Sequence, residues 1–496
     1  MIHDLAPAAL QDRLANAPTD VFEHLIPCDA RPLPAALAAC LLAAFLGLAV
    51  GTNEQIGLAL VVAILGLAAV TAPAGAWALA ALLTALTFRG LVTLGALPSI
   101  ATYLDIPLAW GALAVALLQG MPQSPAARRA ARLLALLAVA VFVAWAFHPS
   151  EPIRPFLYLA LLGEPFAVVA ALLIDPPGPR LRRAIVRTVA ALVAVQVPIA
   201  VYQVLRYGIA DPVQGTLYGA GAGAHTMAGV VAIGAIWALK GRSGAFALRR
   251  LPLAAGMLVV PFLADAKQVI LALPAALLAT NWRHGWLRSL IPVGMIAAAL
   301  VSLVFLYPAG RYAIGYLHQT REGDGGKTEA AALVWTDLRA DPTALAFGRG
   351  PAETVSRAAF LTTDLLQGEQ SPLRIFDLRP ARIALAVQED ALARSGGGTS
   401  FNGALSSALG VLGDLGLVGA AVYVTLVGSL FFSLRRLTSP EAFAAAAGWA
   451  VFAVLGLVFD WWEQPPFSLF LAVLSGLALS EPGRPGQRSS AARVPK

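Results

Sequence analysis

An aspartate and a lysine two residues apart interrupt an otherwise apolar hairpin. Asp265 and Lys267 stand between the apolar stretches 251–264 and 269–279. An ionisable side chain at membrane depth is costly, so such a residue is a candidate for function. The lysine ammonium is a compact cation that suits a diphosphate group. Lys267 is therefore a candidate diphosphate ligand. The competing interpretation is an ion pair with Asp265, or a side chain that extends toward the membrane interface.

Three arginines in or beside apolar segments could add to the same anion site. Arg89 lies among apolar neighbours, Arg154 precedes a long apolar stretch, and Arg206 follows another. Arg154 and Arg206 are equally well explained as anchors at the membrane interface. Arg89 is harder to explain in that way if its segment crosses the bilayer.

His225 follows a glycine-rich stretch, residues 215–223, and precedes an apolar segment. Such glycines allow close approach of the backbone to a phosphate, and a helix amino terminus attracts an anion. The stretch matches no nucleotide-binding fingerprint, because no strand precedes it and no lysine followed by serine or threonine ends it. His225 could act as a general base, although a lone histidine beside a span is more often structural. The six histidines are scattered without paired spacing, so we predict no metal site and no cofactor.

The composition determines the class of protein that must position these residues. Hydrophobic residues make up 58% of the 496 residues, charged residues 13%, and the mean hydropathy is +0.73. A soluble domain could not bury so much apolar surface, so we expect an all-α, polytopic transmembrane helical bundle. About 20 helical residues cross a bilayer. Between twelve and fourteen spans are predicted, at 33–50, 55–72, 75–98, 103–119, 131–148, 156–174, 184–204, 226–239, 251–265, 267–281, 289–307, 412–433, 441–460 and 465–480.

Basic residues gather in alternate loops. Basic residues of short loops stay on the cytoplasmic side, so this alternation predicts orientation. The expected organisation is a cytoplasmic tail at 1–32, a bundle at 33–307, an outer, periplasmic loop at 308–402, carboxy-terminal spans at 403–480 and a disordered cytoplasmic tail at 481–496. The basic loops also explain the net charge of +7 beside anionic lipid, so no nucleic-acid site is predicted. The basic residues are Arg128, Arg129, Arg132, Arg180, Arg182, Arg183, Arg187, Lys240, Arg242, Arg249, Arg250, Arg283, Arg288, Arg435 and Arg436.

The polar loop 308–402 has short apolar patches separated by glycine and proline, and its own core would be marginal. We expect it to lie on the bundle as a lid over a cavity. Residues 335–351 predict a helix, a break before Pro342, and a tight turn with Gly348 and Gly350 on either side of Arg349. The segment from Asn402 to Asp414 predicts an interfacial helix that leads into a span.

The order of these features resembles the O-antigen ligase and polymerase superfamily of polytopic membrane glycosyltransferases. The resemblance covers roughly residues 185–460 and includes the short polar break in a hairpin, the late outer loop with its Phe-Gly-x-Gly-Pro turn at 347–351, and Asn402 before an acidic-x-Gly-x-x-Gly span at 414–419. It implies a metal-independent enzyme that transfers glycan from undecaprenyl diphosphate to an acceptor sugar at the outer face of the bacterial inner membrane. The resemblance also implies membrane lipid and a chain-length regulator or export proteins as partners.

Two positions depart from that family. Its short hairpin often carries an arginine where this chain has Lys267, so the charge is kept but the bidentate geometry is lost. Its ligase branch has a histidine before the asparagine, where this chain has Phe401. The departure favours a polymerase, or a related exopolysaccharide protein, over a ligase.

The resemblance also implies roles for further residues. Lys267 with a loop arginine, Arg349 or Arg311, would stabilise the departing diphosphate. Asp265, His225 and Glu353 are the unranked candidates for a base that orients the acceptor hydroxyl. Direct displacement would invert the configuration at the sugar. Two alternatives remain, a transporter or flippase of the same lipid-linked glycan, and a non-catalytic subunit of an export complex.

Overall fold

The computed structural model describes residues 72–209, 211–219, 223–240, 250–281, 326–362 and 406–481, with a few isolated positions between 294 and 386. All of them belong to one compact unit, Ile64–Lys496. The predicted spans before residue 72, the span 289–307, Arg311, Asn402 and the two predicted tails fall outside the continuous described ranges.

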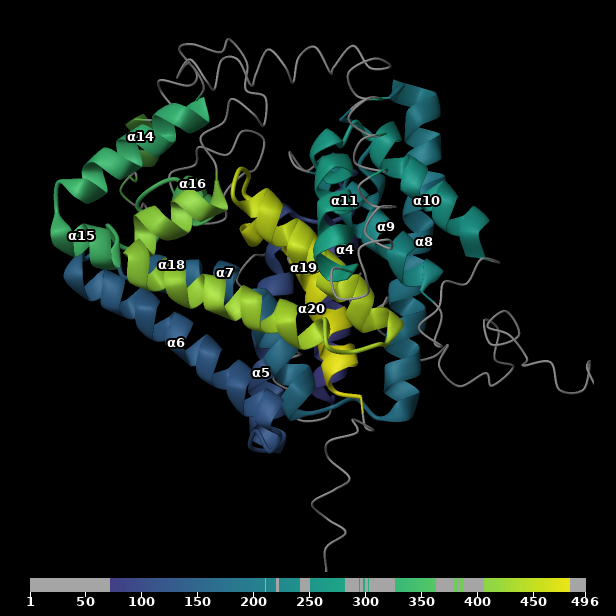
Figure 1. Cartoon of the computed structure of the whole chain (residues 1–496), viewed down its shortest axis with the longest axis horizontal. Coiled ribbons are helices and arrows are strands. Elements are labelled where there is room, and N and C mark those ends of the chain that lie inside the picture. The colour runs from purple at the N-terminus through teal and green to yellow at the C-terminus, as the bar shows by residue number, and fades with distance from the viewer. Residues whose placement is uncertain are drawn as a thin grey trace, which may run out of the picture. The chain divides into compact units, whose positions relative to one another are not determined.

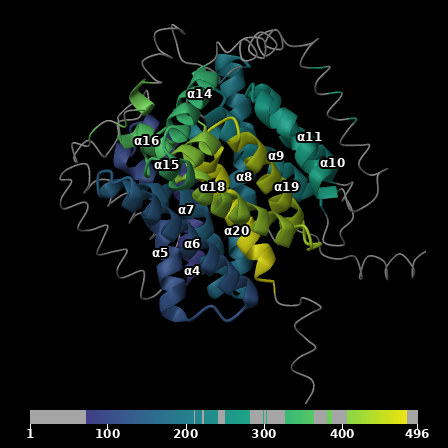
Figure 2. The same ribbon diagram turned by 60° about the vertical axis from the view of Figure 1, so that its left-hand side comes forward.

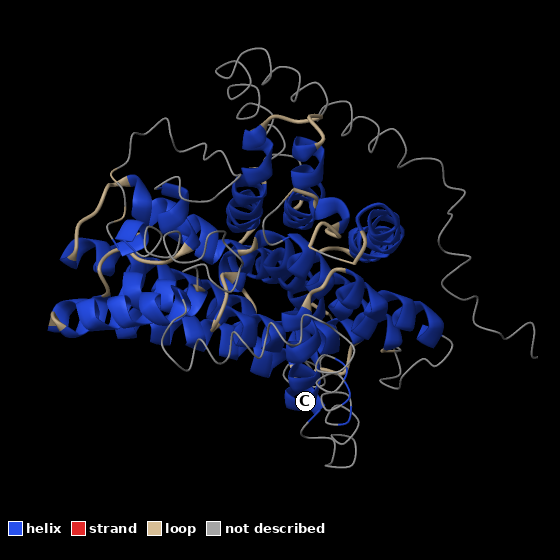
Figure 3. Cartoon of the chain, turned by 90° about the horizontal axis from the view of Figure 1, so that it is seen from above, coloured by secondary structure: helices blue, strands red, loops and turns tan. Residues whose placement is uncertain are grey.

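Every regular element of these ranges is a helix, which confirms the all-α prediction (Figures 1 and 3). The α-helices are α4 (Ala74–Thr93), α5 (Asp105–Gln119), α6 (Pro125–Phe147), α7 (Ile153–Ile174), α8 (Pro179–Tyr207), α9 (Gly223–Leu239), α10 (Leu251–Leu263), α11 (Lys267–Asn281), α14 (Gly326–Arg339), α15 (Pro342–Phe347), α16 (Arg357–Thr362), α18 (Ser407–Leu434), α19 (Pro440–Gly456) and α20 (Pro465–Leu479). Short 3-10 helices are η1 (Ser99–Tyr103), η2 (Gly215–Leu217) and η6 (Trp461–Glu463).

Five of these helices, α4, α6, α7, α8 and α18, are long and apolar enough to cross a membrane. Six more apolar helices, α5, α9, α10, α11, α19 and α20, have between 10 and 17 residues. A helix satisfies its own backbone hydrogen bonds, which is why apolar chain of this kind crosses lipid as helices. The chain is a multi-pass membrane protein, and the count of twelve to fourteen spans stays a prediction.

The ends of several apolar helices meet at one end of the bundle. At this end, the backbone N–H of Ala74, the first residue of α4, donates to Asp175 Oδ2 after α7 (3.0 Å), and Arg182 of α8 donates to the carbonyl of Leu477 in α20 (2.6 Å). The loops of this end carry the described residues of the basic loops, so we call it the basic end. The orientation that the alternation of basic and sparsely charged loops implies stays a prediction.

The opposite end, which we call the polar end, carries the segment 326–362. The helices of this segment, α14, α15 and α16, pack on α6, α7 and α18 (Figure 2). We call residues 326–362 the cap segment. Asp341 begins α15 as a side-chain cap, its Oδ1 accepting from the N–H of Thr343 at 2.9 Å. The predicted helix, break and glycine turn of residues 335–351 are confirmed.

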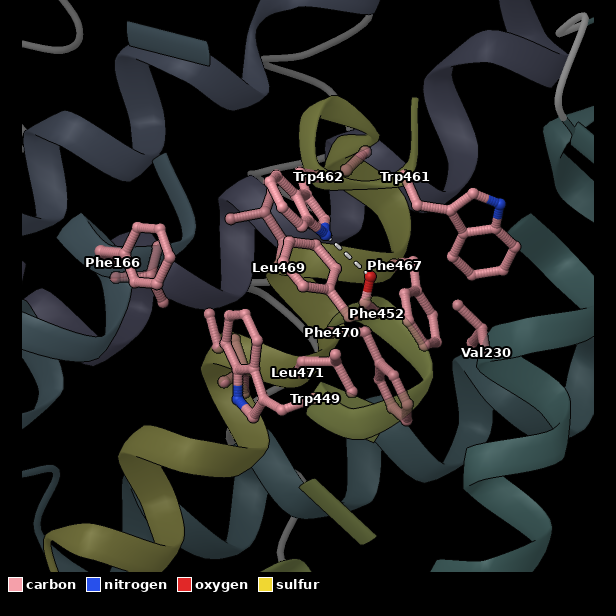
Figure 4. Close-up of a cluster of buried hydrophobic side chains, with 14 of the residues drawn as sticks. Phe166, Val230, Trp449, Phe452, Trp461, Trp462, Phe467, Leu469, Phe470 and Leu471 are labelled. Atoms are coloured by element: carbon pink, nitrogen blue, oxygen red, sulfur yellow. Dashed lines mark hydrogen bonds between the residues drawn. The ribbon is translucent and has the colours of Figure 1, made fainter. Parts of the chain in front are cut away.

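An aromatic cluster packs η6, α19 and α20 against the neighbouring helices (Figure 4). Trp462 donates its indole N–H to the carbonyl of Phe452 (2.9 Å), and Trp449 donates to Ser475 Oγ (2.8 Å). Buried indoles contribute large apolar area but need a partner for the N–H. The short turn between α19 and α20 is therefore fixed on both its apolar and its polar side.

Helix α18 changes direction at Gly416, whose φ of 65° lies in the left-handed region. A Cβ on Gly416 would meet the backbone N of Gly348 at 2.4 Å, and a Cβ on Gly348 would meet the carbonyl of Asp414 at 2.2 Å. Only glycine permits such close approach of two backbones. The short helix 407–415 thus precedes the apolar part of α18, as the sequence predicts.

Candidate functional site

Asp414 fixes the cap segment to α18. Its Oδ1 accepts from the N–H groups of Glu353 (3.1 Å) and Thr354 (2.7 Å) and from Thr354 Oγ1 (2.7 Å), and its Oδ2 accepts from the N–H of Ala352 (3.2 Å). Ala352 has a φ of 61°, a left-handed conformation that costs an L-residue about 1–2 kcal/mol. A buried carboxylate that accepts so many hydrogen bonds holds the backbone of residues 352–354 in place and is not available to a ligand.

Arg154 of α7 binds the turn at residues 352–354, which Asp414 also binds. Its side chain is 1% exposed, and its guanidinium donates to Glu353 Oε1, to the carbonyl of Ala352 (3.2 Å) and to the carbonyl of Arg379. Burial raises the pKa of Glu353 to about 7 even though Arg154 acts to lower it. Arg154 is therefore occupied by protein partners, which supports neither the interfacial anchor nor a diphosphate ligand.

Arg349 is bound by two acids of the cap segment. Its Nε donates to Asp337 Oδ2 (2.5 Å) and its Nη1 to Asp341 Oδ2 (3.0 Å). His148 Nε2 lies 3.2 Å from the same Asp341 oxygen. Hydrogen bonds from Thr343 and His148 hold the pKa of Asp341 well below its usual range. Arg349 thus connects α14 to α15, and its charge is compensated within the cap segment.

Asp265 and Lys267 form the ion pair that the sequence left as one alternative. Lys267 Nζ lies 2.7 Å from Asp265 Oδ2, and Asp265 has a φ of 52° in the tight turn between α10 and α11. His225, in the first turn of α9, lies within electrostatic reach of both residues and of Asp460. Among the described residues, His225 Nδ1 and Asp265 Oδ1 are buried without a hydrogen-bond partner. Three predicted site residues therefore lie close together at the polar end.

Asp460 connects these residues to the cap segment. Asp460 Oδ2 accepts from Gln464 Nε2 (2.5 Å) and lies 4.0 Å from Arg357 Nη1 at the start of α16. Lys327 of α14 also lies within electrostatic reach of Asp460, with its Nζ 5.1 Å from the ring centroid of Phe459. Two basic side chains of the cap segment, Lys327 and Arg357, thus approach one carboxylate.

Glu463 completes this group. Its Oε2 accepts from the backbone N–H of Arg357, and its Oε1 is buried with no hydrogen-bond partner in the described part of the chain. Burial raises the pKa of Glu463 to about 8 and lowers the pKa of Lys327 to about 8. Burial thus favours the neutral form of both side chains. We call the following set the polar centre: His225, Asp265, Lys267, Lys327, Arg357, Asp460, Glu463 and Gln464.

Two predicted arginines are not brought to Lys267. Arg206 is exposed at the end of α8, with its guanidinium 5.5 Å from the ring centroid of Tyr207. Arg89 of α4 interacts electrostatically with buried Asp105 of α5, and Asp105 and its neighbour Glu164 of α7 also interact with Arg357. Arg206 therefore lies among exposed tyrosines, whereas Arg89 shares the carboxyl of Asp105 with Arg357 of the polar centre.

The described structure brings together Lys267, Asp265 and His225, and separates them from Arg154, Glu353 and Arg349. Sequence reasoning missed the contribution of Lys327, Arg357 and Glu463. A signal existed for Glu463, because it and Asp460 are two acids in the short loop between two apolar helices. Each of the two cations looked like an ordinary residue of a polar loop.

Within the described ranges, no three His, Cys, Asp or Glu side chains form a group that could hold a metal ion. No protein-family model matches the chain, and no curated protein matches it. The superfamily resemblance therefore rests on the residues of the sequence alone.

Proposed function

We propose that the protein is a bacterial inner-membrane glycosyltransferase, of the polysaccharide polymerase or ligase type, that takes glycan from undecaprenyl diphosphate. The observation that carries the proposal is that Lys327 and Arg357 of the cap segment approach Asp460, and that Asp460 and Lys267 both lie within electrostatic reach of His225 at the polar end. The polar centre thus gathers three cationic side chains, Lys267, Lys327 and Arg357, and such a set suits an anionic donor.

In the proposed reaction, an acceptor hydroxyl oxygen attacks the anomeric carbon of the donor glycan. The bond between that carbon and the diphosphate oxygen breaks, and the electron pair leaves with the diphosphate. Lys267, Lys327 and Arg357 stabilise the charge that develops on the leaving group. Asp265, His225 or Asp460 accepts the hydroxyl proton. Direct displacement of this kind inverts the configuration of the sugar.

The location of the polar centre supports glycan transfer at a membrane surface. The polar centre lies at the bundle end that is opposite the basic loops, which by the distribution of arginine and lysine is the outer, periplasmic side. The cap segment lies over this end, and loops on a rigid scaffold commonly carry binding groups. Bonds to Asp414 and Arg154 hold the cap segment at the place where Arg357 reaches the polar centre.

The test is a transfer assay on the purified protein in lipid vesicles, with an undecaprenyl-diphosphate oligosaccharide as donor and products separated by size. Lys267→Ala and Lys327→Met are the test variants. Arg206→Ala is the matched control, because it removes an exposed cation from the same end of the bundle. We expect a ladder of products with wild type and the control, and a loss of at least tenfold in rate with both test variants.

Two results would contradict the proposal. One is full activity in both test variants, which would exclude the polar centre as donor site. The other is no product from any protein while labelled carrier crosses the vesicle membrane, which would favour a transporter of the same glycan.

A further inference from the structure

A cavity of about 350 Å³ opens at the basic end, between the first turns of α6, the last turns of α7 and the last turns of α18. Its inner part is apolar and includes Phe166, Val169 and Leu173 of α7, all of which are buried. Its other lining residues come mainly from one face of each neighbouring helix.

Polar side chains line the cavity on the α18 and α6 sides. Ser429 and Ser433 of α18 are four residues apart and so share one face of the helix, and Arg436 lies in the turn that follows α18. Arg129 of α6 lines the cavity as well, and both arginines are exposed. The cavity therefore combines a buried apolar part with two basic groups and two hydroxyl groups.

We infer that this cavity binds one anionic phospholipid of the basic-end leaflet, with the phosphate at Arg129 and Arg436 and the upper part of an acyl chain against α7. Basic pockets between transmembrane helices are suited to anionic lipid headgroups. The two serines are placed to donate to phosphate or glycerol oxygens. The site lies at the opposite end from the polar centre, so it does not depend on the proposed enzymatic function.

The charge and polarity of the cavity lining favour an anionic phospholipid over other occupants. A free phosphate ion would leave the apolar part of the cavity unfilled, and a zwitterionic lipid would bring a cation toward Arg129 and Arg436. The volume lies at the small end of the range for small-molecule sites, ~300–1,000 Å³, which fits part of a lipid rather than a whole one. Lys and Arg near a lipid surface each contribute enough to change affinity about fivefold.

The experiment is native mass spectrometry of the full chain in detergent, titrated with phosphatidylglycerol or with phosphatidylcholine of identical acyl chains. We expect retention of one phosphatidylglycerol and at least tenfold weaker retention of phosphatidylcholine. The double variant Arg129→Gln/Arg436→Gln should weaken phosphatidylglycerol retention by roughly 25-fold. The control Arg128→Gln/Arg183→Gln removes the same charge from exposed positions outside the cavity and should retain the lipid as wild type does.

A second pair of variants tests the apolar part. Leu133→Trp fills the cavity and should reduce retention, whereas Leu136→Trp places the same side chain on the exposed face of α6 and should not. Equal retention of the two lipids would overturn the inference. A loss of phosphatidylglycerol retention in Arg128→Gln/Arg183→Gln as large as that in Arg129→Gln/Arg436→Gln would also overturn it. So would competition by millimolar inorganic phosphate alone, which would show an anion site without a lipid.

Discussion

Replacing Asp414 tests whether one buried carboxylate holds the cap segment in place. In Asp414→Ala, the backbone N–H groups of Ala352, Glu353 and Thr354 lose their acceptor in a buried environment. Each orphaned buried donor costs about 1–3 kcal/mol, so the three together cost roughly 3–9 kcal/mol. Such a loss approaches the whole stability of a domain, ~5–15 kcal/mol. We expect this variant to unfold in the turn or to fail to accumulate.

Asp414→Asn is the informative variant because it keeps the shape of the side chain. Its amide oxygen can replace Oδ1 and retain the bonds from Glu353 and Thr354, whereas its NH₂ group would face the N–H of Ala352. One bond becomes a contact between two donors, which costs about 1–3 kcal/mol. The melting temperature in detergent should fall by a few degrees, and less than in Asp414→Ala.

Hydrogen–deuterium exchange gives the local measurement. Peptides that contain residues 352–354 should exchange faster in Asp414→Asn and faster still in Asp414→Ala. Asp211→Asn, at an exposed position, is the control for lost charge and should change neither exchange nor melting temperature. If Asp414→Ala melts and exchanges as wild type does, the carboxylate does not hold the cap segment and the reasoning is refuted.

Three further predictions concern neighbouring groups. Burial raises the pKa of Glu463 to about 8 in the folded protein, from about 4.5 in the unfolded chain. The stability that protonated Glu463 contributes is therefore complete below pH 4.5 and is lost as the pH rises through 8. The melting temperature should fall between about pH 5 and 9, and it should fall less in Glu463→Gln. Gly348→Ala should prevent accumulation of folded protein, because its Cβ would lie 2.2 Å from the α18 backbone, whereas Gly428→Ala, with open space around the Cβ, should accumulate normally by size-exclusion chromatography. Arg154→Met leaves Glu353 without its cation. Such a loss costs about 3–5 kcal/mol of stability for a fully buried pair, and less here because Glu353 is partly exposed. The melting temperature should therefore fall, and Glu353→Gln in the same background should recover part of the loss.

The local pattern of the sequence was enough to predict an all-α polytopic membrane protein and much of the order of its helices. The basic loops and the apolar stretches predicted alternating helices, and the proline and glycines of residues 335–351 predicted a helix, a break and a turn. These features depend on neighbours in the sequence, whose periodicity and turn chemistry are visible without a structure. The pairing of Asp265 with Lys267 was likewise within reach, because only one residue separates them.

Pairings between distant segments were not predictable in this way. Arg154 and Glu353 are separated by 199 positions, and Asp414 binds a turn about 60 positions before it. Nothing in the local sequence of Arg154 distinguishes a buried ligand of the cap segment from an anchor at the interface. The partner of an arginine is determined by which helices pack together, and that packing follows from the whole bundle.

The bonds of the cap segment give a physical reason for coupling between the turn and the polar centre. Asp414 binds the backbone of residues 352–354, and the N–H of Arg357 donates to Glu463. Residues 352–357 therefore connect the bent start of α18 to η6 over a few peptide units. Arg357 can approach Asp460 only while both connections hold. A perturbation at Asp414 should thus weaken any ligand of the polar centre although Asp414 lies outside it, and ligand binding should in turn slow amide exchange at residues 352–354, because such coupling is reciprocal.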